Sequence, residues 1–178
     1  MAVSKSLYGE LNGVKVNLFT ITNKNGMKAE IIEKGATLEK LFVKDKNGSI
    51  IDILSGHDTL EGHVERSDYQ GVVVGQYANR IKGGKFSIDG TEYNVTLNEK
   101  GITSLHGGAE YSSEIWCGEI VGDNAVKFTY HSPDGREGFP GNVDVEVTYT
   151  FTDNDELVLD YKAVSDKKTV INLTNHAF

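Results

Sequence analysis

The stretch Val14-Lys15-Val16-Asn17-Leu18-Phe19-Thr20-Ile21-Thr22-Asn23-Lys24-Asn25-Gly26 decides the fold class of this chain. Its first nine residues alternate between apolar and polar side chains over most of their length, which is typical of a β-strand with one buried face. Asn25-Gly26 then favours the left-handed backbone of a tight hairpin turn. Met27 to Ile32 is therefore expected to return as the second strand of a hairpin.

The same pattern recurs along the chain. Two further hairpins are expected, with turns at Asn47-Gly48 and Asp89-Gly90. Their strands and those of the last third are Leu38 to Val43, Ile50 to Leu54, Lys85 to Ile88, Thr91 to Val95, Val126 to Tyr130, Val143 to Phe151, Glu156 to Val164 and Thr169 to Leu173. Asp58 to His63 is the one expected helical turn, with Asp58 as its N-cap. The sequence thus predicts an all-β fold, a large antiparallel β-sandwich or curved sheet.

Size and composition are those of an ordinary globular domain. With 178 residues, 38% hydrophobic and 25% charged, the chain predicts a single domain over residues 1–178. The formal net charge of −8 disfavours nucleic acid and anionic lipid as partners. No stretch is apolar enough to span a bilayer and the N-terminus lacks the apolar centre of a secretory signal, so we expect a cytoplasmic protein without membrane attachment.

Cysteine and histidine spacing gives no metal or disulfide pattern. Cys117 is the only cysteine, and beside Trp116 in a strand-like segment it is expected to be a small packed thiol. His57, His63 and His131 do not match the ligand spacings of zinc or iron sites, so no metal is predicted. No glycine-rich loop of the phosphate-binding kind is present either.

Two internal segments combine polar side chains with a strand or with glycine. Asn79 and Arg80 follow the apolar run 72–74 and offer donors and acceptors suited to several hydroxyls of one ligand, although the residues by themselves favour an ion pair at the rim of the domain. His106 precedes Gly107 and Gly108, whose lack of side chains allows close approach to a ligand. The alternative is a histidine that only forms structural hydrogen bonds.

The last residues, 172–178, form a third polar segment. Asn172, Thr174 and His176 alternate along an expected strand, so one face presents all three, either to a polar cavity or to solvent. A polar cluster directly after an apolar strand is an unusual place for a chain to end, and we expect the site begun by His176 to continue in residues beyond Phe178. The irregular loop 132–141 carries Phe139, expected to be a packed plug rather than a binding wall.

Taken together, these strings resemble the aldose 1-epimerase family. The resemblance rests, in order, on Ala78-Asn79-Arg80-Ile81, Gly84-Lys85-Phe86-Ser87-Ile88-Asp89-Gly90 with Tyr93, Leu105-His106-Gly107-Gly108, Trp116, Ser132-Pro133-Asp134-Gly135, Gly138-Phe139-Pro140-Gly141 and Asn172-Leu173-Thr174-Asn175-His176. It implies the family's antiparallel supersandwich, truncated to its N-terminal half, an aldose such as galactose or glucose as substrate, and no cofactor.

The resemblance also implies roles for individual residues. His176 corresponds to the general acid and His106 to its partner histidine in the sugar site, while Asn79 and Arg80 correspond to contacts with sugar hydroxyls. Phe178 stands at a tyrosine position of the same substrate site. Gln76 replaces a common arginine, which changes a supporting contact only.

The reaction implied is the interconversion of α and β anomers through ring opening, which needs an acid and a base together. The resemblance puts the family's catalytic glutamate in a second half that this chain lacks. Glu99, Glu110 and Glu137 are candidate substitutes, and no spacing selects among them. Two alternatives stay open: a non-catalytic carbohydrate-binding module, and a structural β-domain whose sheets are completed by a partner chain.

Overall fold

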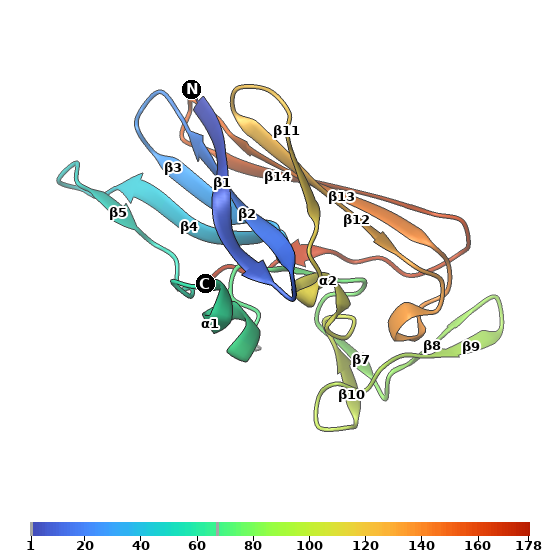
Figure 1. Cartoon of the computed structure of the whole chain (residues 1–178). Coiled ribbons are helices and arrows are strands. Elements are labelled where there is room, and N and C mark those ends of the chain that lie inside the picture. Colours follow the sequence, from blue (N-terminus) through green and yellow to red (C-terminus); the bar gives the residue numbers. More distant parts are fainter. Residues whose placement is uncertain (1, 67) are drawn as a thin grey trace.

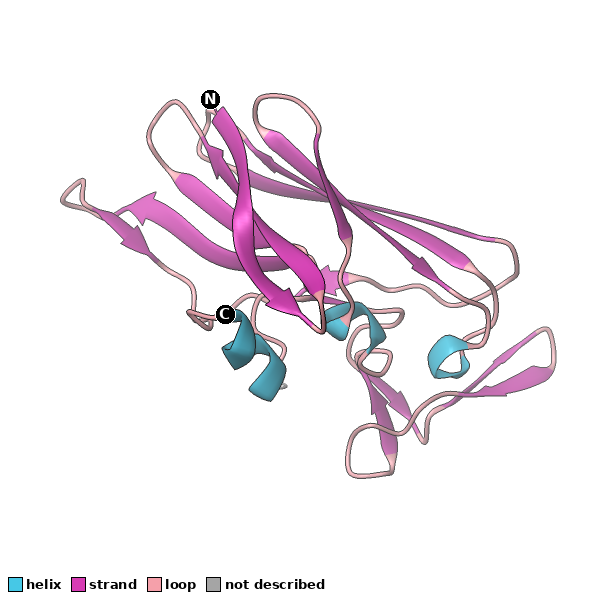
Figure 2. Ribbon diagram, viewed as in Figure 1, coloured by secondary structure: helices cyan, strands magenta, loops and turns pink. Residues whose placement is uncertain are grey.

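The computed structural model describes residues 2–66 and 68–178, and two antiparallel sheets dominate it (Figures 1 and 2). The stretch around Val14 to Gly26 forms the second strand of the first sheet and the turn that follows it. The five strands of this sheet are neighbours in chain order: β1 (Ala2–Leu11), β2 (Val14–Thr22), β3 (Lys28–Ile32), β4 (Thr37–Lys44) and β5 (Ile50–Asp52). The expected hairpins at Asn25-Gly26 and Asn47-Gly48 are confirmed.

The second sheet comes from the C-terminal third of the chain and is also a meander. Its four strands are β11 (Cys117–Ile120), β12 (Ala125–Ser132), β13 (Val143–Phe151) and β14 (Leu157–Ser165). In Figure 1 this sheet, yellow to red, lies against the blue and cyan first sheet.

The core lies between the two sheets. Along β13 every second side chain is buried, from Val143 to Phe151, as its alternating sequence predicts. Phe19 of β2 meets Phe128 of β12 edge to face, with ring centroids 5.4 Å apart. Burying a side chain of this size stabilises the fold by roughly 1.5–3 kcal/mol. The predicted β-sandwich is thereby confirmed.

The chain between the sheets builds the end of the sandwich where the polar segments gather. It contains α1 (Leu60–Glu65), β6 (Val73–Val74), β7 (Arg80–Lys82), β8 (Lys85–Ile88), β9 (Thr91–Asn94), β10 (Thr103–Leu105) and α2 (Glu110–Ser113). β7 pairs with β10, β8 with β9, and β6 with the terminal strand β15 (Thr174–Asn175). Segments about 100 residues apart in sequence therefore meet at this end of the molecule.

Two expected elements differ in the structure. Thr59, not Asp58, caps α1, because its hydroxyl accepts the backbone N–H of Gly62 at 3.2 Å, while the Asp58 carboxylate accepts from Lys40 at 3.1 Å. The segment Thr169 to Leu173 is not a strand. The side-chain amide of Gln76 binds its backbone and hydroxyl groups instead, so regular pairing begins only at Thr174.

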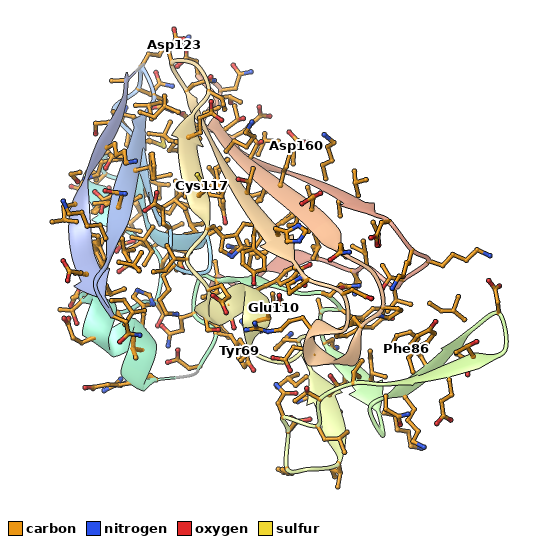
Figure 3. All side chains as sticks on the ribbon, turned by 45° about the vertical axis from the view of Figure 1, so that its right-hand side comes forward. Tyr69, Phe86, Glu110, Cys117, Asp123 and Asp160 are labelled. Carbon is orange, nitrogen blue, oxygen red and sulfur yellow. The ribbon has the colours of Figure 1, made fainter. Side chains whose placement is uncertain are left out.

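The sequence also predicted the burial of two side chains, wrongly for Cys117 and correctly for Phe139. Cys117 is exposed rather than packed, because the alternation of β11 turns its neighbour Gly118 against the ring of Phe19 and points the thiol outward (Figure 3). Phe139 is buried and stacks on Phe86 of β8, with centroids 5.9 Å apart, next to a short 3-10 turn at Arg136–Gly138. The loop 132–141 is therefore anchored by a packed aromatic ring, as predicted.

Candidate functional site

The pairing of β7 with β10 brings Asn79, Arg80 and His106 together. Arg80 lies opposite Leu105 in the ladder. Directly beyond this pair, Asn79 and His106 are joined by two hydrogen bonds. The His106 N–H donates to the Asn79 carbonyl at 2.8 Å, and the Asn79 N–H donates to Nδ1 of the His106 ring at 3.1 Å. Because Nδ1 accepts this hydrogen bond, it carries no proton, and the neutral ring has its proton on Nε2.

The terminal segment brings His176 to the same place. β15 pairs with β6, and the ladder continues as the His176 N–H donates to the Val72 carbonyl at 2.9 Å. The side-chain amide of Asn175 donates to the Gly71 carbonyl at 2.7 Å and to the hydroxyl of Tyr149 at 3.1 Å. The ring of His176 thus lies 4.8 Å from that of His106, at an angle of 83°.

Two aromatic rings border the histidine pair. Tyr69 lies 4.8 Å from His106 and 6.0 Å from His176, measured between ring centroids. Phe178 lies 4.9 Å from His176 and is 62% exposed. Tyr69, labelled in Figure 3, is a residue of this cluster that the sequence did not predict, and its only signal was an aromatic side chain just before the apolar run 72–74. Apart from ring contacts, no partner of the His176 imidazole is found among residues 2–66 and 68–178.

Arg80 forms an ion pair, as the alternative explanation from its sequence predicted, and it also keeps N–H groups that are free to donate. Its Nε and Nη2 donate to the carboxylate of Glu99 at 2.7 and 2.6 Å, and Nη1 donates to Oδ1 of Asn79 at 3.2 Å. A guanidinium has five N–H groups, so two remain available to a ligand.

Three residues of the same cluster have a strained backbone. Tyr69, Asn79 and His106 have φ angles of 59°, 66° and 55°, a left-handed conformation that is uncommon for residues other than glycine. Gly107 follows with φ of 70°, and a Cβ there would lie 2.3 Å from the backbone nitrogen of Gln76. The glycine after His106 is therefore needed for close approach between two segments of the chain.

Burial determines the protonation state of His106. Burial lowers the pKa of His106 to about 4, with smaller contributions in the same direction from His176 and Arg80 and an opposing one from Glu99. At neutral pH His106 is thus a hydrogen-bond donor through Nε2 rather than a proton source.

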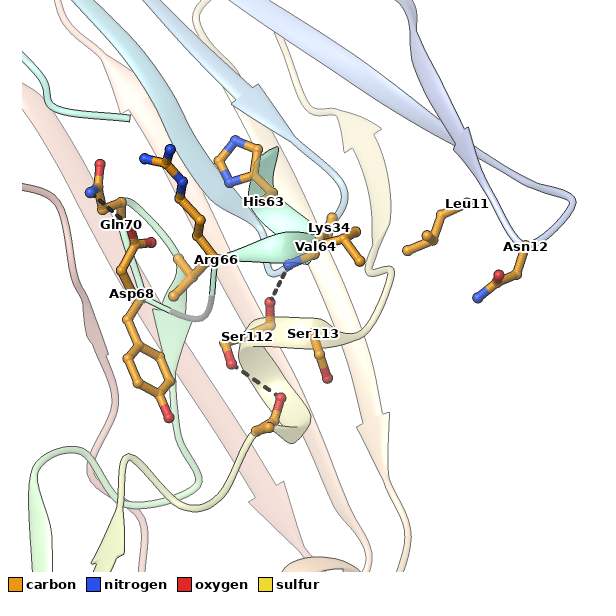
Figure 4. Close-up of a pocket in the computed structure, with 13 residues that line it drawn as sticks. Leu11, Asn12, Lys34, His63, Val64, Arg66, Asp68, Gln70, Ser112 and Ser113 are labelled. Atoms are coloured by element: carbon orange, nitrogen blue, oxygen red, sulfur yellow. Dashed lines mark hydrogen bonds between the residues drawn. The ribbon is translucent and has the colours of Figure 1, made fainter. Parts of the chain in front are cut away.

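A pocket of about 250 Å³ lies beside this cluster (Figure 4). Tyr69 contributes to its wall, together with Lys34 and residues of α1 and α2, whereas His106 and His176 do not. Nζ of Lys34 donates to the carbonyl of Ser112 in α2 at 3.0 Å, which explains its burial as a contact with the C-terminal end of that helix. The two histidines are half-buried and lie outside the lining of this pocket.

Comparisons with known proteins agree with the family resemblance. The family model described as aldose 1-epimerase matches residues 17–178. The chain belongs to the aldose 1-epimerase family. A galactose mutarotase from Rattus norvegicus is 39% identical over 100% of this chain and 52% of its own length. This chain therefore spans about half the length of the curated relatives it matches.

Solved structures of similar proteins extend the agreement to the fold. An aldose epimerase homologue from C. elegans has a TM-score of 0.86 and 33% identity, covering 92% of this chain and 50% of that one. A galactose 1-epimerase from Lactobacillus acidophilus has a TM-score of 0.85 and 25% identity, covering 98% of this chain and 52% of that one. The fold is the supersandwich of this family.

Gln76, which according to the family resemblance stands in place of an arginine, supports the terminal segment. Its side-chain amide donates to Oγ1 of Thr169 at 2.7 Å and to the Val170 carbonyl at 2.9 Å, and its own carbonyl accepts the Asn172 N–H at 3.0 Å. The replacement leaves Asn79 and Arg80 in contact with the rest of the cluster.

The three candidate carboxylates differ in their surroundings. Glu99 is bound by Arg80, whose hydrogen bonds lower the pKa of that carboxyl. Glu110 is buried and accepts from the hydroxyls of Tyr130 and Ser132 at 2.9 and 3.0 Å. The carboxylate of Glu137 packs on Gly108. None of the three contacts His176 among the described residues, so the geometry selects none of them as its partner.

The described ranges contain neither a metal-binding group of side chains nor a membrane-spanning helix. No group of three or more His, Cys, Asp or Glu side chains in residues 2–66 and 68–178 is arranged to hold a metal ion. No helix in this part of the chain has the length and apolar character required to cross a membrane.

Proposed function

We propose that this chain is the sugar-binding and acid-supplying half of an aldose 1-epimerase that interconverts the α and β anomers of aldohexoses such as galactose and glucose. The observation that carries the proposal is the pair of imidazoles 4.8 Å apart, of which His106 has Nδ1 engaged and His176 is bordered only by rings. This gives the two histidines different chemical capacities within one small site.

The proposed reaction opens and recloses the sugar ring. His176, as general acid, donates a proton to the ring oxygen while a base takes the proton of the anomeric hydroxyl, so that the C1–O5 bond breaks and an aldehyde forms. Rotation about the bond between C1 and C2 exposes the other face. On reclosure O5 attacks C1, His176 recovers its proton, and the base returns one to the new hydroxyl.

The remaining residues bind the sugar in this proposal. Nε2–H of His106 donates to a sugar oxygen. The ring stays neutral throughout the reaction, since its low pKa disfavours protonation. Asn79 and the two available N–H groups of Arg80 bind hydroxyls, and Phe178 borders the sugar beside His176. The base is proposed to come from the part of the family fold that this chain does not span, in one longer polypeptide or in a partner chain.

Polarimetry tests the proposal directly. The mutarotation of freshly dissolved α-D-galactose is followed with this chain and with a version extended to the length of its relatives. We expect acceleration by the extended version and little by the chain alone, because one general acid or base typically contributes ~10²–10⁴ in rate. His176→Ala should abolish the acceleration, whereas His131→Ala, at an exposed site on β12, should not.

Calorimetry with galactose separates the enzyme from a carbohydrate-binding module. Sugar binding by the extended protein without any acceleration would replace the enzyme proposal with the binding one, and absence of both would reject the sugar site altogether. The cytoplasm is the proposed location of the protein, and fractionation of cells that produce it with an antibody against this chain tests that part.

A further inference from the structure

Two neighbouring side chains of the loop between β9 and β10 contact the site around the two histidines. They bind Arg80, Tyr69 and Leu105, the residue before His106. Asn98 and Glu99 lie on this loop. The carboxylate of Glu99 holds the guanidinium of Arg80. The side chain of Asn98 binds Leu105 and Tyr69.

The side chain of Asn98 brackets the residue that precedes His106. Its Oδ1 accepts the N–H of Leu105 at 2.7 Å, and its Nδ2 donates to the carbonyl of the same residue at 2.9 Å. Both peptide groups around Leu105 are therefore fixed by one planar amide. The peptide that links Leu105 to His106 is one of them, so the amide restrains the backbone from which the imidazole projects.

A third contact extends from Asn98 to the rings of the site. Nδ2 also lies 3.3 Å from the hydroxyl of Tyr69, to which it donates. The ring of Tyr69 packs against both histidines. One amide is thus connected to His106 through the backbone and to the His106–His176 pair through an aromatic ring.

This arrangement restrains a strained conformation. His106 and Tyr69 both have positive φ angles, 55° and 59°, and such conformations persist in residues other than glycine only where surrounding contacts enforce them. The His106 backbone must hold that conformation for Nδ1 to meet the N–H of Asn79. The Asn98 amide thus binds the hydroxyl of one of these residues and the peptide group that precedes the other.

We propose that Asn98 is a positioning residue for the histidine pair, which sets the orientation and tautomer of His106 through its bracket on Leu105 and its hydrogen bond to Tyr69. The proposal rests on the proposed function only in treating His106 as part of the sugar site. Asparagine suits the position because one side chain supplies both the acceptor and the donors. Aspartate would keep the acceptor and lose both donor contacts.

The loop itself does not depend on this side chain. The N–H groups of Glu99 and Thr103 pair with each other's carbonyls at 3.0 and 3.3 Å, and Ile102 donates to Glu99 at 3.1 Å. Asn98 is exposed, so its replacement leaves no buried cavity. We therefore expect substitutions at this position to leave the fold intact and to change the site.

The test is nitrogen NMR of the full 178-residue chain with ¹⁵N-labelled histidine, in which ring shifts report tautomer and protonation. The variants are Asn98→Ala, Asn98→Asp and, as a matched control, Asn94→Ala at an exposed position of β9. In Asn98→Ala we expect His106 to populate both tautomers and its pKa to rise from about 4 towards the ordinary value of about 6.5. Asn98→Asp should show a smaller change in the same direction, and Asn94→Ala none.

Two results would overturn the proposal: His106 signals in Asn98→Ala that coincide with wild type through the titration, or an equal change in Asn94→Ala. Should Asn98→Ala fail to fold, Tyr69→Phe and Asn98→Asp decide, since each removes only part of the contacts, and wild-type His106 signals in both reject the role. None of these readouts needs catalysis. If polarimetry rejects the proposed mutarotase activity, the NMR experiment still tests the role of Asn98 independently.

Discussion

His106 illustrates how one hydrogen bond fixes the chemistry of a residue. The backbone N–H of Asn79 points at Nδ1, and the ring can accept it only while neutral. The pKa is about 4 in the folded chain and about 6.5 when unfolded, so the unfolded state binds more protons between these values. The stability contributed by neutral His106 is present above about pH 6.5 and is lost as the pH falls through about 4.

We accordingly expect the wild type to lose about 1 kcal/mol of unfolding free energy between pH 7 and pH 5 relative to His106→Gln, which cannot titrate, because solvent screens part of the effect on this half-buried ring. Urea unfolding of both proteins at the two pH values measures the difference. Parallel pH dependences would contradict the low pKa. Comparison with the variant cancels the carboxylates, which titrate in both proteins.

Glu110 gives a dependence of the opposite sign. Burial raises the pKa of this carboxyl from 4.5, although the hydroxyls of Ser132 and Tyr130 oppose the rise. A raised pKa means that the folded state binds the proton more tightly, so this contribution is full at low pH and is lost as the pH rises through the folded pKa. We expect Glu110→Gln to gain stability over wild type as the pH increases from about 4.5 to 7. Melting temperatures across that range test it, and a constant difference between the two proteins would argue against the shift.

At the scale of elements, the pairing of β15 with β6 is what joins His176 to the rest of the site. The strand has only two residues, and Asn175 anchors it through the Gly71 carbonyl and the hydroxyl of buried Tyr149. Both partners keep a second hydrogen bond, since the Gly71 carbonyl also accepts the Leu38 N–H at 2.8 Å and the Tyr149 hydroxyl donates to the Ala36 carbonyl at 2.7 Å. Each of the two bonds lost in Asn175→Ala is therefore expected to contribute about 0.5–1.5 kcal/mol net. We expect Asn175→Ala to lower the unfolding free energy by about 2 kcal/mol and to separate the rings of His176 and His106.

Chemical denaturation and ring contacts between the two histidines in NMR measure these effects. Thr174→Ala, at an exposed position of the same strand, is the control and should change neither. Retention of the histidine contacts in Asn175→Ala would show that the ladder alone holds β15.

The elements also show which parts of the structure are readable from sequence. Strands such as β2 and β13 were predictable because a period of two and an adjacent turn are local properties. The segment from Thr169 to Leu173 has the same local character yet is held by the side chain of Gln76, more than 90 residues away. The histidine pair was predictable only through the family resemblance, while Tyr69 and Asn98 depend on long-range contacts that no local pattern reports.

At the scale of the whole molecule, the two sheets have edges that nothing in the described residues covers. β5 lies at one end of the five-stranded sheet and β14 at one end of the four-stranded sheet. Ile50, Ile51 and Ile53 are 45%, 45% and 50% exposed at the first of these edges, and the carbonyl of Phe178 accepts the N–H of Ser55 just beyond it. An apolar edge strand has unpaired backbone N–H and C=O groups that can pair with a further strand. The relatives carry about as much chain again as this one matches.

We therefore expect this chain to associate with the second half of a relative, supplied as a separate polypeptide, and to gain mutarotase activity in doing so. The apolar edge at β5 would be buried by the added half, and the proposed base would reach His176. Sedimentation of the mixture should show a one-to-one complex, and polarimetry should show acceleration that neither half produces alone. Ile51→Lys, on the exposed β5 edge, should weaken the complex, whereas Ile120→Lys on β11 should not. Two halves that sediment independently, or a complex unaffected by Ile51→Lys, would mean that this edge is not where the added half attaches.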